Sequence, residues 1–98
     1  MTKRIGIRID PDDNVVTVVE DAGPEDEINF VTGGGSQRIV PRQATAMGHK
    51  VALRDIEAGE KIIKYGQTIG TAAQDIRQGD HVHVHNVRSA VQGMEDES

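Results

Sequence analysis

The chain of 98 residues contains no cysteine and no tryptophan, and its phenylalanine and tyrosine residues are limited to Phe30 and Tyr65. Without cysteine, disulfide bonds and thiolate metal sites are excluded. With two such rings, the hydrophobic core must be built from valine, isoleucine, leucine and alanine. The sequence also lacks the aromatic platform on which single-stranded nucleic acids stack their bases.

Positive charge is in the minority as well: 11 lysine and arginine residues face 16 aspartate and glutamate residues, for a net charge of −5. An acidic surface repels phosphate backbones, which argues against nucleic-acid binding. No segment approaches the roughly 18 apolar residues of a membrane span, and the start MTKRIGIRID has no apolar run suited to a signal peptide. We therefore expect a cytoplasmic, soluble protein that binds neither nucleic acid nor membrane.

The size and composition are those of one small globular domain, with 36% hydrophobic and 28% charged residues. A chain of this length buries somewhat less than about 68% of the surface exposed by its unfolded form. One modest core is feasible, whereas a large enclosed active site made by this chain alone is not expected. We predict a domain over residues 1–90 and an acidic flexible tail over residues 91–98.

Short strand patterns separated by turn residues run along the chain. The alternation in RIGIRI predicts a strand whose buried face carries Ile5, Ile7 and Ile9. The β-branched run NVVTVVE predicts a second strand, and INFV and QRIV on either side of TGGGS predict a hairpin. Because no stretch sustains an apolar period of 3.6 residues, we predict an all-β fold with short strands and glycine-rich turns.

One pattern occurs twice, at an offset of 20 residues. Residues 55–62 and residues 75–82 both read D-I-x-x-G-[E/D]-x-[I/V]. Each copy predicts a buried isoleucine, a tight turn at a glycine and then a new strand. Two copies of one turn indicate two similar loops folded against each other.

The run HVHVHN, residues 81–86, contains three of the four histidines. As a strand it would place His81, His83 and His85 on one face, with Val82 and Val84 facing the core. Neighbours on that face are about 6.6 Å apart and the outer pair about 13 Å apart. Imidazole nitrogens lie about 2.0–2.1 Å from a shared metal, so at most two of the three can serve one ion. The alternative is an ordinary strand with a solvent-facing polar side.

Other segments offer weaker signals. His49 follows a loop, and KYGQ places Lys64 and Tyr65 beside a glycine turn, which suits a carboxylate or hydroxyl ligand as well as an ordinary strand end. DPDDN begins like a calcium loop but lacks the glycine and glutamate that an EF-hand needs. TGGGS lacks the Lys-Ser/Thr pair of a phosphate loop.

Several blocks in a fixed order carry a resemblance to a known family. The run from Gly48 to Asn86 contains GHK-x-AL-x-DI, G-x-x-IIKYG-x-x-IG and DI-x-x-G-x-HVH-x-HN, and DDNV at residues 12–15 precedes them. These blocks resemble the small or amino-terminal domain of the altronate and galactarate dehydratases. The resemblance covers most of residues 5–88, strongly over 48–86 and weakly over 20–45. It implies a SAF domain with a β-clip fold.

The resemblance also implies a function. In this family a large catalytic part removes water from a sugar acid to give a 2-keto-3-deoxy acid, assisted by a divalent metal, usually Fe²⁺ or Mn²⁺. The chain looks like a separate small subunit that needs a large dehydratase subunit as its partner and is inactive alone. Sulfolactate sulfo-lyase has a similar small subunit, which leaves the substrate class open.

Residue roles follow from the matched blocks. The resemblance implies that His83 and His85 are metal ligands or acid–base groups and that His81 is a surface residue. It also implies a substrate-binding set, which comprises His49, Lys50, Lys64, Tyr65 and Asn86. The family commonly has a histidine three residues before the aspartate of its DNV motif, whereas this chain has Asp10 there. A carboxylate can also ligate a metal, so we include Asp10 as a third metal ligand.

Two other functions remain compatible with the sequence. The chain could be a free-standing β-clip module that binds a sugar acid or a protein without chemistry, or a subunit that only stabilises or regulates the large chain. Apolar surface meant for a partner could also pair two copies of the isolated chain into a homo-oligomer.

Overall fold

The computed structural model describes residues 2–32 and 35–89, which form nine β-strands and contain no helix. The all-β prediction is therefore confirmed. The predicted acidic tail, residues 91–98, and the predicted domain end at residue 90 lie outside the described residues. Nothing in the described part of the chain forms a helix of the length and hydrophobicity that a membrane crossing needs.

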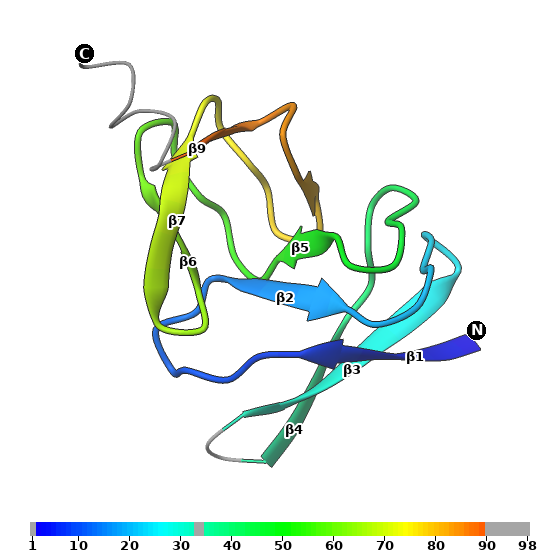
Figure 1. Cartoon of the computed structure of the whole chain (residues 1–98). Helices are drawn as coiled ribbons and strands as arrows, with labels where there is room; N and C mark the ends of the chain where they lie inside the picture. The colour runs from blue at the N-terminus through cyan, green and yellow to red at the C-terminus, as the bar shows by residue number, and fades with distance from the viewer. Residues whose placement is uncertain (1, 33–34, 90–98) are drawn as a thin grey trace.

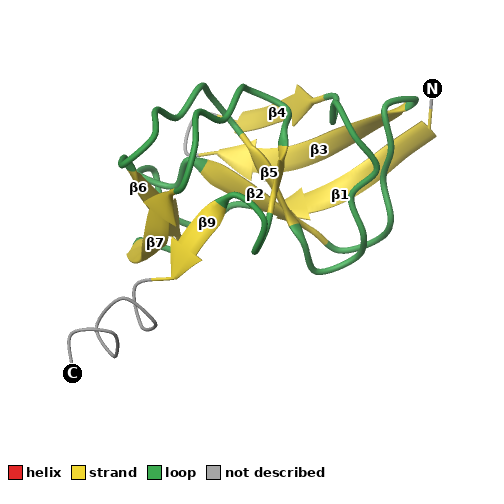
Figure 2. Cartoon of the chain, turned by 90° about the horizontal axis from the view of Figure 1, so that it is seen from above, coloured by secondary structure: helices red, strands yellow, loops and turns green. Residues whose placement is uncertain are grey.

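The strands form two sheets (Figures 1 and 2). The large sheet has the order β4-β3-β1-β2-β5-β8, with bounds Gly35–Ile39, Asp26–Thr32, Thr2–Ile7, Val15–Val18, Lys50–Ala52 and His81–Val82. The small sheet has the order β6-β7-β9, with bounds Lys61–Lys64, Gln67–Ala72 and Val87–Ser89. All paired strands are antiparallel except β1 and β3, which are parallel. The predicted hairpin is confirmed as β3 and β4.

Two apolar clusters hold the sheets together, and β2 contributes to both. Val16 and Val18 point into the first cluster, on the inner face of the large sheet, with Ile28, Phe30 and Val51. Val15 points to the opposite face and joins the second cluster, between the two sheets; its other members include Ala52, Ile56, Ile62, Ile76 and Val82. Successive residues of a strand point to opposite faces, so a strand buried on both faces needs apolar residues on each, which Val15 supplies on one face and Val16 and Val18 on the other.

The prediction of which face of β1 is buried is wrong. Ile5, Ile7 and Ile9 are 59%, 39% and 68% exposed, whereas Gly6 is buried. A Cβ atom on Gly6 would lie 2.6 Å from Cγ2 of Val16, so only glycine fits where β1 crosses the inner cluster. The alternation is real, but its inward face is the glycine face.

The predicted pairing of two similar turns is confirmed. Ile56 and Ile76 form an antiparallel bridge. Asp55 Oδ1 accepts a hydrogen bond from the Gln78 N–H at 2.8 Å, and Asp75 Oδ1 accepts one from the Ala58 N–H at 2.9 Å. Each turn therefore supplies the carboxylate that satisfies a backbone donor of the other.

A second pair of turns is joined in the same way but has only one of the two side-chain hydrogen bonds. Ala22 and Thr45 form an antiparallel bridge, and Asp21 Oδ1 accepts a hydrogen bond from the Met47 N–H at 2.8 Å. The reciprocal bond would join residue 44 to the backbone of residue 24. Residue 44 is alanine and residue 24 is proline, which has no N–H, so neither group is left unsatisfied.

Candidate metal centre

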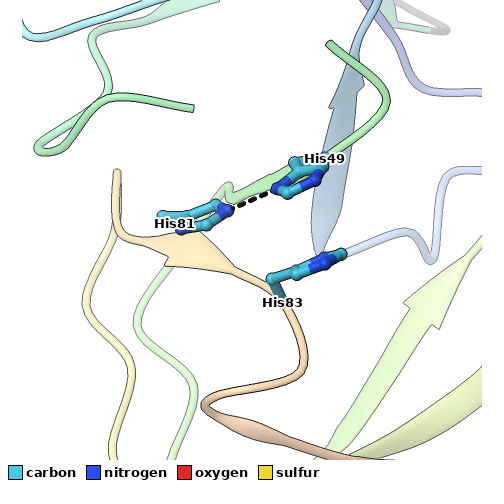
Figure 3. Close-up of side chains that lie close together, drawn as sticks. All are labelled: His49, His81 and His83. Carbon is cyan, nitrogen blue, oxygen red and sulfur yellow. Dashed lines mark hydrogen bonds between the residues drawn. The ribbon is translucent and has the colours of Figure 1, made fainter. Parts of the chain in front are cut away.

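Strand pairing between β5 and β8 brings three histidines together. Val51 pairs with His81 and Lys50 pairs with Val82, so the next position in this antiparallel ladder sets His49 opposite His83. Paired and alternate residues share a face, which places the three imidazoles on one side of the sheet edge. Figure 3 shows the rings of His49 and His81 linked side by side, with His83 stacked beside them.

The distances within this cluster fit a metal ion. Nδ1 of His49 lies 2.9 Å from Nε2 of His81, and the rings of His49 and His83 stack with centroids 3.7 Å apart. One nitrogen from each of the three residues lies within 4.8 Å of the others. Two imidazole nitrogens on one tetrahedral ion are about 3.3 Å apart. The three rings are stacked nearly parallel, so they would have to rotate to point one nitrogen each at a shared ion. Three protein ligands leave room for a substrate or water ligand.

The electrostatics of the cluster favour neutral imidazoles. Burial lowers the pKa of His81, and the neighbouring histidines and Lys50 lower it further. Burial also lowers the pKa of His83, as do His49 and Lys50 nearby. A neutral ring has a free lone pair, which is the form that binds a metal.

The side chain of Asn86 is hydrogen-bonded to the backbone of two of the three histidines. Its side-chain oxygen accepts a hydrogen bond from the His83 N–H at 2.9 Å, and its amide donates to the His81 carbonyl at 2.8 Å. The residue is 3% exposed. Both ends of the Asn86 carboxamide are bonded to backbone, which positions two histidines, and substrate binding by Asn86 stays a prediction.

The HVHVHN segment is less regular than predicted. β8 contains only His81 and Val82, and a turn follows. Val82 is buried as predicted, but Val84 is 80% exposed because the chain has already left the sheet. His81, which we expected at the surface, is partly exposed, and its ring lies beside those of His49 and His83. His85 is exposed, with its ring centroid 5.1 Å from that of His81.

The four related turns explain why His49 is available for chemistry. In three of them the fourth residue after the bridge position is acidic: Asp26, Glu60 and Asp80 each accept a hydrogen bond from a backbone N–H of their own turn. In the fourth turn this residue is His49, whose ring instead contacts His81 and His83. Aligning all four turns in the sequence would have singled out His49 as the position without the local carboxylate.

The early DDNV motif lies at a different place from the histidine cluster. Asp13 Oδ2 accepts hydrogen bonds from the N–H groups of Ile9 and Asp10, and its Oδ1 accepts one from Gly66 at 2.7 Å. Burial alone would raise the pKa of Asp13, but these backbone donors lower it below its usual value. Asn14 bonds through its side chain to the backbone of β6, donating to the Lys61 carbonyl at 2.8 Å. The motif thus joins the β6–β7 hairpin to β2.

Asp10 belongs to this structural motif and not to the cluster. Its Oδ2 is packed so closely against Gly66 that a Cβ there would lie 2.8 Å away. Among the described residues, the group of side chains able to hold a metal contains His49, His81 and His83 and does not include Asp10 or His85.

The predicted substrate-binding lysines and tyrosine lie on β5 and on the β6–β7 hairpin. Burial lowers the pKa of Lys50, and the positive charge of Lys64 lowers it further. The Lys64 ammonium lies 5.0 Å from the centre of the Tyr65 ring. Tyr65 has a φ of 55°, and Gly66 follows with a φ of 78°, so the hairpin presents the phenol from a left-handed turn that bulky residues rarely adopt.

A cavity of about 490 Å³ opens beside the cluster. His49 and His81 form one part of its lining, and Arg4, Asp21 and Asp26 supply the charged part. Two of the three histidines of the cluster therefore border a hollow that could admit a small molecule.

Comparisons with known proteins agree with the sequence resemblance. A family model described as the altronate/galactarate dehydratase SAF domain matches residues 4–90. Altronate dehydratase from Escherichia coli K12 is 39% identical over 91% of this chain, but the match covers only 17% of that enzyme. The alpha subunit of (2R)-sulfolactate sulfo-lyase from Chromohalobacter salexigens is 52% identical over 49% of this chain and 51% of that subunit. The corresponding subunit from Paracoccus pantotrophus is 40% identical over 53% of this chain and 78% of its own length.

Proposed function

The chain belongs to the SAF-domain family of altronate and galactarate dehydratases, and from this premise we propose that it is the small subunit of a two-part sugar-acid dehydratase. The convergence of His49, His81 and His83 at one sheet edge is the observation that carries the proposal. A large chain supplies the remainder of the active site, since the matched region spans about a sixth of the altronate dehydratase that it resembles.

The proposed reaction is the elimination of water from a sugar acid. A base removes the proton on the carbon next to the carboxylate, and the hydroxyl on the following carbon leaves as water after accepting a proton. The enol that remains becomes a 2-keto-3-deoxy acid. The negative charge that develops beside the carboxylate needs cationic groups or a metal for stabilisation.

The residues of this chain have separate roles in the proposal. His49, His81 and His83 would hold a divalent ion, Fe²⁺ or Mn²⁺, which supplies a positive charge for the substrate carboxylate. His85, exposed at the margin of the cluster, would carry a proton to or from the substrate. Lys64 would bind the carboxylate, and Tyr65 would bind a substrate hydroxyl. Lys50 lies on the opposite face of β5 from His49, so we do not place it in the substrate site.

A second function is favoured by one comparison. The sulfolactate sulfo-lyase alpha subunit from Chromohalobacter salexigens is about as long as this chain and shares 52% identity over its matched half. A sulfo-lyase would use the same removal of a proton next to a carboxylate, with sulfite as the leaving group in place of water.

The test uses this chain co-purified with the large dehydratase chain encoded in the same genome. Formation of a keto acid from altronate, galactarate or sulfolactate is measured with and without Fe²⁺ or Mn²⁺, together with sulfite release. We expect activity that needs both chains and collapses in His81→Ala and His83→Ala. Full activity from the large chain alone would refute a catalytic small subunit, and sulfite release without sugar-acid turnover would select the second function.

A further inference from the structure

The outer face of the large sheet carries an apolar strip that no described residue covers. We define the outer strip as Ile5, Ile7, Val19 and Val31, all exposed. Ile5 and Ile7 alternate along β1, the Val19 N–H donates to the Ile5 carbonyl, and Val31 lies two residues after Asn29, the β3 partner of Ile5. Paired and alternate residues of a sheet share a face, so the four side chains form one surface.

At its other end, the outer face of the large sheet is covered by the small sheet. At the far end of β2 and β5, Val15 and Ala52 are buried beneath the small sheet. Figure 2 shows β6, β7 and β9 at one end of the molecule and β1, β3 and β4 extending away from them. The large sheet therefore has one face that is half covered by this chain and half exposed, and the exposed half is the outer strip.

Two polar groups mark the border between the halves. Thr17 pairs with Ile7 on one side and with Lys50 on the other, so the three residues form a row across β1, β2 and β5. Thr17 is 9% exposed, and its Oγ1 has no hydrogen-bond partner among the residues that the structure describes. Within residues 2–32 and 35–89, no carboxylate lies within ion-pair distance of the Lys50 or Lys64 ammonium.

We propose that the outer strip, with Thr17 and Lys50 at its border, is the docking surface for the large dehydratase chain. This inference rests on the proposed function, which supplies the partner. The partner surface would present branched apolar side chains to the strip and a carboxylate to Lys50, because a buried ammonium requires an opposite charge. Contiguous exposed apolar surface of this kind marks an interaction site in soluble proteins.

The comparisons and the net charge indicate that a large chain, and not a second copy of this chain, docks on the outer strip. The relatives that match nearly the whole chain contain a much larger remainder, 83% of the E. coli enzyme, so the domain in those enzymes is accompanied by a large body of protein. A second copy of this chain is the less suitable occupant. Its net charge of −5 makes two copies repel.

The docking surface and the histidine cluster lie on opposite faces, which makes them separable by mutation. His49 follows the alternation of Val18 on the inner face, whereas Lys50 follows that of Thr17 on the outer face. Substitutions in the outer strip should therefore change the affinity for the large chain and leave metal binding by the isolated chain unchanged.

The experiment measures the dissociation constant between this chain and the large chain encoded in the same genome, for the wild type and for the double variant Ile5→Asp, Val31→Asp. Both side chains are more than half exposed, so the isolated variant should fold. The matched control is Thr68→Asp, which adds a carboxylate at an exposed position of β7 on the small sheet. We expect the double variant to bind at least about tenfold more weakly, the control to bind normally, and Lys50→Gln to reduce the salt dependence of binding.

Amide hydrogen exchange of the wild type gives a second measurement that needs no substitution. On addition of the large chain, the amides of β1 and β3 should become protected. Unchanged affinity of the double variant, or protection confined to other strands, would overturn the docking surface while leaving the proposed function intact. A wild-type chain that neither binds nor activates the large chain would refute the proposed function itself. A homodimer that the double variant disperses, with large-chain binding retained, would assign the strip to a second copy.

Discussion

Nδ1 of His49 and Nε2 of His81 lie 2.9 Å apart, although the two residues are 32 positions apart in the sequence. The contact exists because β5 and β8 pair with Val51 opposite His81. His83 joins the pair by stacking on His49. A metal-capable cluster is thus built from two segments that only strand pairing brings together.

The first prediction concerns which histidines bind metal. His81→Ala removes one of three converging nitrogens and should weaken Co²⁺ binding to the isolated chain by about tenfold or more. His85→Ala, outside the cluster, should leave Co²⁺ affinity nearly unchanged while reducing activity of the assembled enzyme. Titration monitored by the visible Co²⁺ absorption provides the measurement. An equal loss of Co²⁺ affinity in both variants would place the metal closer to His85 than we propose.

The second prediction concerns the positioning role of Asn86. Asn86→Ala leaves the His83 N–H and the His81 carbonyl without their side-chain partner, which should lower the free energy of unfolding by about 1–3 kcal/mol. Asn86→Asp keeps the acceptor for His83 but buries a carboxylate whose second oxygen faces the His81 carbonyl, so a loss at least as large as that of Asn86→Ala is expected. Urea unfolding at neutral pH checks both values. A variant as stable as the wild type would show that these bonds contribute little.

The third prediction concerns acid stability through Asp13. The folded state lowers the pKa of Asp13 below its ordinary value of 3.8, so the folded state binds fewer protons than the unfolded state as pH falls. Its contribution is fully present above that ordinary value and is lost as the pH falls through the lower folded-state pKa. Asp13→Asn should reduce stability at neutral pH and flatten the loss of stability between about pH 5 and pH 2. The measurement is the free energy of unfolding of the wild type and of Asp13→Asn across this pH range. Parallel curves for the two proteins would contradict the role assigned to Asp13.

The fourth prediction concerns the close contact at Gly6. Gly6→Ala places a methyl group 2.6 Å from Val16 Cγ2 and 2.7 Å from Ile28 Cγ2 in the inner cluster, so we expect destabilisation by about 1–3 kcal/mol. Gly23→Ala is the matched control, because its Cβ would meet only Asp26 Oδ2, at 4.0 Å. Thermal unfolding should show a clear decrease in Tm for Gly6→Ala and little change for the control. Similar Tm values would mean that β1 shifts to accommodate the methyl group.

Local patterns in the sequence determined much of this molecule. The β-branched runs and glycine turns predicted an all-β fold, the pattern around Ile56 and Ile76 predicted two turns folded together, and the hairpin between INFV and QRIV is present as β3 and β4. These features depend on side-chain alternation and turn chemistry, which act over a few residues. The ordered blocks from Gly48 to Asn86 also identified the family, which the matching family model confirms.

Tertiary structure decided which faces and which partners these residues use. The alternation in β1 does not say that Gly6 points inward, because that choice depends on Val16 and Ile28 occupying the space that a side chain would need. Likewise, HVHVHN does not show that the strand ends after Val82 or that His49 meets His81 and His83. Each outcome is determined by pairing between distant strands, whose register follows from packing of the whole core and cannot be read from any one segment.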